Sequence, residues 1–306
     1  MSIRATREGR SLVEPMYYDH PSSPDAYRNK NQYLFGSQLL VSPITTKKAR
    51  STNMGSTQTW LPAGRYVDVF TGTVYDGDRV IGMHRPTEGV PVLAQEGSIL
   101  PLDKPDEGQV KNGAPLPEAI EVILVVGKDG HFELLEDNGE AETLEKAVLA
   151  STPITFTQAT GEIKIGPTSN PLVKHRKWSV QLPGLDHRSG RLERLTAQLD
   201  GKAVETSIGT DPMTGHATIS LDEPVQSEKA FTIKLGSDPQ LRQNDTKGEI
   251  RHILEQAQIK HDTKWAVWKV LEEKLSPKVL MSRLRAIEGV DEELMDAMME
   301  FLLAQD

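Results

Sequence analysis

The sequence predicts a mainly β protein that ends in helices. Between about residues 36 and 236, β-branched and aromatic runs alternate with Gly, Pro, Asn and Asp. Turns recur about every 8–12 residues, which is typical of antiparallel sheets. After the breaker cluster 236–239, apolar residues recur with a helical period instead. With 306 residues, the chain is long enough for about two domains.

The first 33 residues have no sustained period. They are rich in Pro, Ser, Asp and Asn, and we expect a loop with one short strand at Leu12–Tyr18. A domain that begins with a loop of this length is unusual. One interpretation is a floppy tail, and the other is a segment that normally packs on a missing part.

Short strand candidates fill the middle of the chain. Asp129-Gly130 and Asn138-Gly139 mark tight turns, because these residues tolerate a positive φ. The strand candidates are Leu39–Val41, Thr59–Pro62, Tyr66–Phe70, Thr73–Tyr75, Val90–Ala94, Ile99–Leu102, Ile120–Val126, His131–Leu135, Ile154–Thr157, Glu162–Ile165, Trp178–Leu182, Arg194–Leu199, Ala217–Leu221 and Phe231–Leu235.

Residues 245–306 carry four apolar stripes with helical spacing. Ser276 suits an N-cap and Pro277 the first helical position, which predicts a helix start. The last stripe is rich in Met. Such a stripe can form a groove for a partner, but it is more often the core of a small helical hairpin. About 60 residues are marginal for independent stability. We therefore expect a small bundle that packs on the rest of the chain or self-associates through 245–306.

Composition excludes several classes of protein. A net charge of −9 argues against a nucleic-acid partner. No apolar run approaches the roughly 18 residues of a membrane span, and no signal peptide is recognisable. We therefore expect no membrane partner and a cytoplasmic location, with the secretory pathway as the alternative if a longer parent chain carries an upstream signal. Cysteine is absent, which excludes thiolate metal sites and cysteine nucleophiles. The glycosylation sequon Asn244-Asp245-Thr246 would matter only in a secreted parent.

The residues contain no recognisable catalytic or metal motif. The eight histidines include no helical metal pair, and nucleotide-binding and serine-hydrolase signatures are missing. Acidic clusters do occur, and a glycoside hydrolase needs two carboxylates, but acidic turns also solubilise sheet ends. Nearby aromatics favour a sandwich core over a sugar-stacking surface. The acidic clusters are Asp76/Asp78, Asp103/Asp106/Glu107 and Glu133/Glu136/Asp137/Glu140, and the aromatics are Trp60, Tyr66, Phe70 and Tyr75.

Three stretches in this order resemble one enzyme family. Residues 13–21 and 31–44 read VEPMYYDHP and NQYLFGSQLLVSPI. Residues 60–72 read WLPAGRYVDVFTG, followed by PVLAQEGSILP over 91–101. Residues 135–141 read LEDNGEA. Over about residues 10–240 the chain resembles the C-terminal part of glycoside hydrolase family 31, which contains α-glucosidases and α-xylosidases.

The resemblance implies a domain order. Residues 1–35 would be the segment by which the chain exits a (β/α)8 catalytic barrel that is itself missing. Residues 36–103 would then form a proximal antiparallel β-sandwich, and residues 104–236 a distal one. The helical extension 245–306 falls outside the resemblance. The fold class we expect is therefore mainly β, with two consecutive sandwiches between a barrel-exit segment and a small helical bundle.

The resemblance also implies a function and its limits. The chain would be the C-terminal portion of a retaining α-glycosidase that acts on terminal α-glucosides or oligosaccharides through the missing barrel, without a metal or organic cofactor. The family's catalytic aspartate motifs are not found, so we assign no catalytic, cofactor-binding or metal-binding residue and expect the chain alone to be inactive. The alternatives are a free-standing carbohydrate-binding module and a truncated, non-catalytic product.

Overall fold

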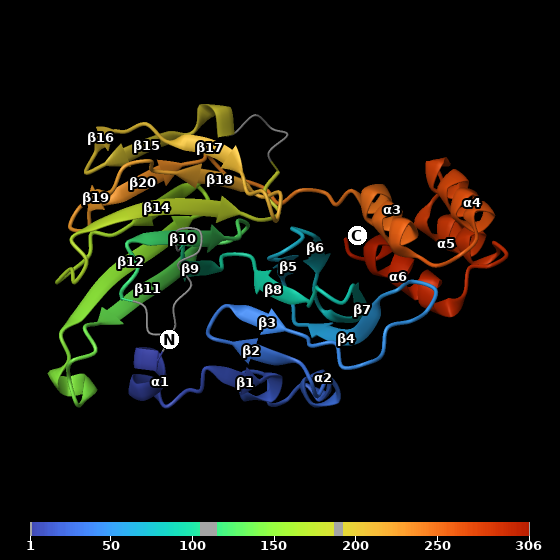
Figure 1. Ribbon diagram of the computed structural model, residues 1–306, viewed down its shortest axis with the longest axis horizontal. Helices are drawn as coiled ribbons and strands as arrows, with labels where there is room; N and C mark the ends of the chain where they lie inside the picture. Colours follow the sequence, from blue (N-terminus) through green and yellow to red (C-terminus); the bar gives the residue numbers. More distant parts are fainter. Residues whose placement is uncertain (1, 105–114, 187–191, 306) are drawn as a thin grey trace.

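The computed structural model describes residues 2–104, 115–186 and 192–305. It confirms a mainly β fold that ends in helices. Figure 1 shows a pair of stacked sheets at one end, helices at the other end, and a further sheet between them. In their order across it, the strands of that middle sheet are β1 (Val13–Pro15), β2 (Tyr33–Phe35), β3 (Leu39–Val41), β8 (Val92–Gln95), β5 (Arg65–Asp68) and β6 (Val74–Asp76). A hairpin of β4 (Gly55–Leu61) and β7 (Arg79–Arg85) accompanies it.

The stacked sheets form the distal part of the molecule. One has the order β17 (Ser207–Thr210), β18 (Ala217–Ser220), β14 (His175–Leu182), β10 (Ala119–Leu124) and β9 (Ile99–Asp103), with β19 (Val225–Gln226) paired to β14. The other has the order β11 (Gly130–Asp137), β12 (Leu149–Thr157), β13 (Glu162–Ile165), β20 (Phe231–Lys234), β15 (Thr196–Leu199) and β16 (Lys202–Ala203). Among the described strands, β10 and β14 pair in parallel and the rest are antiparallel.

Alternation along the strands builds the distal core. In β12, Ala150, Thr152, Ile154 and Phe156 are buried, while the residues that alternate with them are partly exposed. This is the period of two that the pleat requires. The same apolar core continues into the middle sheet through Val67 and Val74. The sheets are therefore packed together through a shared core.

The N-terminal segment is more ordered than the sequence suggested. It contains α1 (Ser2–Glu8), β1, a 3-10 turn (Met16–Tyr18), α2 (Pro24–Arg28) and β2. The expectation of a loop with one strand over 12–18 was therefore wrong in detail. The strands were hidden because they are three residues long, too short for a period to show. Through β1 and β2, part of the expected exit segment belongs to the middle sheet.

The strand β7 did not stand out in the sequence. Its inward-facing residues are Ile81, Met83 and Arg85, all buried. A buried arginine breaks the apolar alternation by which a half-buried strand is recognised. The charge on this strand therefore needs a partner inside the protein.

The C-terminal segment forms the predicted helices. They are α3 (Thr246–Gln256), α4 (His261–Glu272), α5 (Pro277–Arg285) and α6 (Glu292–Leu302). Two further 3-10 turns lie at Leu144–Lys146 and Leu192–Arg194. Asp245 and Asp291 cap α3 and α6 by accepting backbone N–H groups, and Ser276 precedes α5 with Pro277 in its first turn. The apolar stripes of the helices meet in their own core, which supports the core interpretation of the Met-rich stripe. No described helix is long and apolar enough to cross a membrane.

The Asn138-Gly139 turn has the predicted backbone, since Gly139 has a φ of 68°. A Cβ at Gly139 would meet no atom within 4 Å. Gly139→Val should therefore destabilise the protein through backbone strain alone, by about 1–2 kcal/mol. Gly139→Asn should lose much less, because Asn tolerates this region. Chemical denaturation of both variants measures the difference, and equal stabilities would contradict a left-handed residue here.

Candidate functional site

The acidic clusters found in the sequence support the sheets in the structure. In the third cluster, Glu136 forms a buried ion pair with Arg176 at 2.8 Å, and Glu133 accepts a hydrogen bond from Ser151. Asp76 is 3.9 Å from Arg79 in the first cluster. Asp106 and Glu107 lie outside the described residues. In the parts of the chain that the structure describes, no group of three or more His, Asp or Glu residues could hold a metal.

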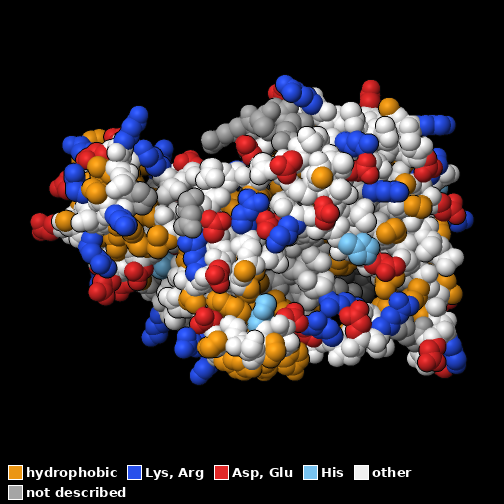
Figure 2. All heavy atoms as spheres, turned by 180° about the vertical axis from the view of Figure 1, so that it is seen from behind, with side chains coloured by type: hydrophobic (Ala, Val, Ile, Leu, Met, Phe, Trp, Pro, Cys, Tyr) orange, Lys and Arg blue, Asp and Glu red, His pale blue; other side chains and the backbone are white. Residues whose placement is uncertain are grey.

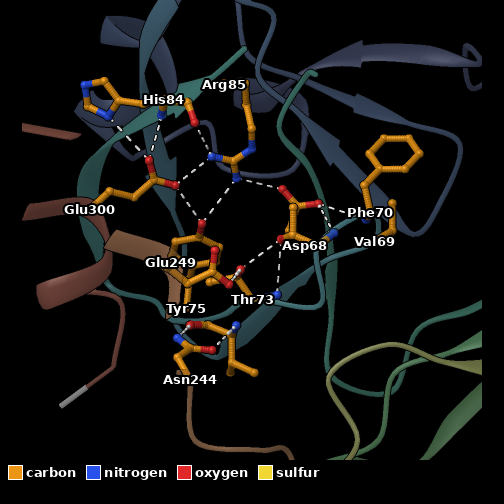
Figure 3. A network of polar contacts seen from close by, with 12 residues as sticks. Asp68, Val69, Phe70, Thr73, Tyr75, His84, Arg85, Asn244, Glu249 and Glu300 are labelled. Carbon is orange, nitrogen blue, oxygen red and sulfur yellow. Dashed lines mark hydrogen bonds and ion pairs between the residues drawn. The ribbon is translucent and has the colours of Figure 1, made fainter. Parts of the chain in front are cut away.

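A different carboxylate, Glu300 on α6, forms the centre of a buried polar network (Figure 3). Its Oε1 accepts hydrogen bonds from Arg85 Nη1 at 2.8 Å and from the Tyr75 hydroxyl at 2.7 Å. Its Oε2 accepts from the backbone N–H of His84 at 2.7 Å. Both ends of the carboxylate are therefore bound by groups of the proximal strands.

Arg85 connects Glu300 to a second buried acid. Its Nη2 donates to Asp68 Oδ2 at 2.7 Å, and the other Asp68 oxygen accepts the backbone N–H groups of Phe70 and Thr71. One buried cation thus lies between two buried anions. Burial of unpaired charges costs several kcal/mol each, so each member of the network requires the others.

The protonation states follow from this geometry. Burial opposes ionisation of Glu300, but the Arg85 charge and the hydrogen bonds it accepts outweigh burial and lower its pKa below 4.5. Burial and then the Glu300 charge raise the pKa of Tyr75 well above 10. Glu300 is therefore ionised and the Tyr75 hydroxyl remains a donor, as the hydrogen bond between them needs.

Backbone contacts bind the helical segment to the same sheet edge. The Asn244 side chain donates to Val74 O at 2.7 Å and accepts from Val74 N at 2.9 Å, so it pairs with β6 as a strand would. Ala304 O accepts from Asp76 N at 2.7 Å and from Arg79 Nη2 at 2.9 Å. Residues 244–304 are therefore fixed to the body at both ends. In the structure, the helical segment therefore packs on the rest of the chain, which is one of the two arrangements expected from the sequence.

Sequence reasoning missed Glu300 because it lies inside an apolar stripe. Leu294, Ala297 and Met298 share its buried face of α6. The sequence did contain one indication of the network. Glu300 is flanked by core positions of α6, and Arg85, a residue of opposite charge, stands among the core positions of β7. Charges buried in this way are seldom found without partners.

An exposed apolar face lies at the opposite edge of the middle sheet. Figure 2 shows hydrophobic side chains gathered over β1 and α2. Tyr17 and Tyr27 stack with ring centroids 5.1 Å apart and planes within 6°. We call this the aromatic face, and its members, which are 39–59% exposed, are Val13, Tyr17, Tyr18, Tyr27 and Phe35. Exposed aromatic groups of this kind commonly mark an interaction surface.

The aromatics singled out from the sequence divide between core and surface. Trp60, Tyr66 and Tyr75 are buried, as the core interpretation requires, whereas Phe70 is 53% exposed. The aromatic face comes from other residues, in the segment 1–35 that was expected to be a loop with one short strand at Leu12–Tyr18. Its members are too scattered along the chain for a sequence pattern to join them.

Comparison with known proteins defines the class of the fold. Residues 9–100 match the model of the glycosyl hydrolase family 31 C-terminal domain. The structure resembles the family 31 dextranase of Flavobacterium johnsoniae, with a TM-score of 0.58 over 76% of this chain and 30% of that one, at 19% identity. The α-xylosidase of Xanthomonas citri gives a TM-score of 0.51 at 25% identity, over 73% of this chain and 22% of that one.

Curated relatives agree with this class. An α-xylosidase of Saccharolobus solfataricus is 26% identical over 60% of this chain and 25% of its own length. A 1,3-α-isomaltosidase of Kribbella flavida is 34% identical over 31% of this chain and 12% of its own length. The chain thus corresponds to the C-terminal portion of glycoside hydrolase family 31 enzymes, and it spans about a quarter of the α-xylosidase.

The first prediction from this site concerns Glu300. Glu300→Gln keeps the shape of the side chain but leaves Arg85 short of one anion, so the free energy of unfolding should fall by about 3 kcal/mol. Glu293→Gln, an exposed change on the same helix, should stay within about 0.5 kcal/mol. Urea denaturation measures the free energy of unfolding of both variants. If both variants lost the same amount, the buried network would contribute no more to stability than an exposed glutamate does.

The second prediction concerns pH. Because the folded pKa of Glu300 is lowered, the stabilisation it gives is complete above its ordinary pKa of 4.5 and disappears as the pH falls through the folded value. The stability gap between the wild type and Glu300→Gln should stay constant near neutral pH and narrow below about pH 4.5. A gap that widens in acid would contradict this sign. Denaturation series at several pH values measure it.

The third prediction concerns the sequon at Asn244. Both polar atoms of its side chain are bound to Val74, and the side chain is only partly exposed, so a glycan on Nδ2 would crowd the edge of β6. Folded protein from a secretory host should carry no glycan at Asn244, and Asn244→Asp should lower the melting temperature by removing the donor. Intact mass and thermal melting test this. A glycosylated chain that melts like the wild type would contradict it.

Proposed function

We propose that this chain is the non-catalytic C-terminal β portion of a retaining α-glycosidase and that it supports a (β/α)8 catalytic barrel. The parent activity would be hydrolysis of terminal α-glucosides or α-xylosides. The match to the family 31 C-terminal domain supports this, as do relatives with far longer chains. The proposal holds whether one polypeptide or two supply the parts.

The aromatic face carries the proposal. It lies over β1 and α2 (Figure 2), in the segment where the family match begins. Rings that are about half exposed gain free energy when another domain covers them. We propose that this face packs on the barrel, which would lie within the additional length of the relatives.

The chemistry would reside in the barrel. A retaining glycosidase uses one carboxylate as nucleophile and a second as acid and base, held about 5 Å apart. Within the acidic clusters, Glu136 is instead paired with Arg176 and Glu133 accepts a hydrogen bond from Ser151. We therefore propose that the chain positions the barrel and takes no part in bond cleavage.

A chimera tests the proposal. In the Saccharolobus solfataricus α-xylosidase, the matching C-terminal portion is replaced by this chain. We expect turnover of p-nitrophenyl α-xyloside by the chimera and none by the isolated chain. Tyr17→Ser with Tyr27→Ser should abolish or greatly reduce the activity, because the face can no longer exclude water.

A matched pair of changes provides the control. Val148→Ser with Ile208→Ser removes two exposed apolar residues of the distal sandwich instead, and activity should be retained. If the tyrosine pair had no more effect than this control pair, docking through the aromatic face would be refuted. Turnover by the isolated chain would refute the assignment of a non-catalytic role.

A further inference from the structure

A small cleft lies between the N-terminal segment and the two sandwiches. Its volume is about 340 Å³, at the small end of the range for small-molecule sites. Its walls come from the 3-10 turn after β1, the β2–β3 turn and the turn before β11. Apolar side chains of the middle sheet, Met16, Leu40 and Leu93, form part of the lining.

Tyr66 gives this cleft an unused hydrogen-bonding group. The residue is only 5% exposed and lines the cleft, yet its hydroxyl makes no hydrogen bond with any residue that the structure describes. Burial and the nearby Glu96 carboxylate raise the pKa of Tyr66 to about 12. The hydroxyl is therefore protonated and can both donate and accept. The hydroxyl is not among the fully buried unpaired atoms of the described residues, so it opens to the cleft and is free to bond a ligand or a water there.

The rim is polar and already fixed. The His20 ring lies edge-on to Trp60 with centroids 5.1 Å apart, and no described residue is hydrogen-bonded to its nitrogens. Gln95 donates to Ala63 O at 3.1 Å, which leaves its side-chain oxygen available. Side chains held in place lose little entropy when they bind a ligand.

The charges around the cleft are balanced. Glu96 is paired with Arg65 at 2.9 Å and with Lys128 at 2.9 Å. Asp19 is paired with Arg10 at 2.6 Å. Because these carboxylates and cations are paired with one another, they have little net charge to attract either a cation or an anion. A neutral ligand whose groups both donate and accept suits this lining best.

We infer that this cleft binds one neutral sugar ring, through the Tyr66 hydroxyl at its base and His20 and Gln95 at its rim. Sugar hydroxyls donate and accept at once, and the C–H face of a pyranose can lie on the apolar part of the lining. The inference stands on the cleft alone and does not depend on the docking of a barrel.

D-Glucose is the probe, titrated into the isolated chain and followed by backbone NMR. We expect saturable shifts at Gln95, Gly97 and Gly130, with an affinity in the millimolar range that is usual for one small ring. D-Glucuronate should bind no more tightly than glucose, because the cations beside the cleft are already paired with Glu96 and Asp19. Tyr66→Phe, which keeps the ring, should weaken glucose binding about fivefold, the value of one hydrogen bond.

Tyr33→Phe is the matched control, because it removes a hydroxyl on β2, a strand of the same sheet, at a residue that does not line the cleft. It should leave glucose affinity unchanged, and both variants should melt like the wild type. The inference is overturned if shifts stay linear up to about 100 mM glucose. It is also overturned if the shifts lie elsewhere, or if a folded Tyr66→Phe binds as well as Tyr33→Phe.

Discussion

The buried contact between Arg85 and Glu300 is the constraint on which the arrangement of this protein depends. An arginine placed on the inward face of β7 cannot remain unpaired, because the cost of a buried charge exceeds what a strand of this length gains by folding. Asp68 satisfies one side of the guanidinium and Glu300 the other. The sheet is thus completed by a side chain more than 200 residues later in the sequence.

The consequence is that the helical segment is an integral part of the protein body. Its four helices have their own apolar core, as a separate module would. However, Tyr75, His84 and Val74 all take partners from residues 244–300. Self-association is therefore not needed to explain how the segment is held, and it remains a proposal. The same fixed frame holds the aromatic face at the opposite edge of the sheet, and it holds the cleft, which is lined by inner strands such as β8 and β5.

The sequence predicted the class of fold well because local signals agreed. Alternation in β12 and the Ser276-Pro277 helix start each act over a few residues, and the structure has both. The N-terminal strands and β7 were missed, the former because they are short and the latter because Arg85 interrupts its apolar face. The polar network and the aromatic face were not predictable, since both depend on residues that only the tertiary fold brings together. The division into domains at residues 35 and 103 stays a prediction.

Hydrogen–deuterium exchange on a chain truncated after Gln243 tests the central role of this contact most directly. If Glu300 and Asn244 complete the middle sheet and the β4–β7 hairpin beside it, amides of β6 and β7 should lose protection while those of β12 and β13 in the distal sandwich keep theirs. Unchanged protection of β6 and β7 would mean that the sheet is stable without the helices. The buried ion pair would then be a consequence of docking and not its cause.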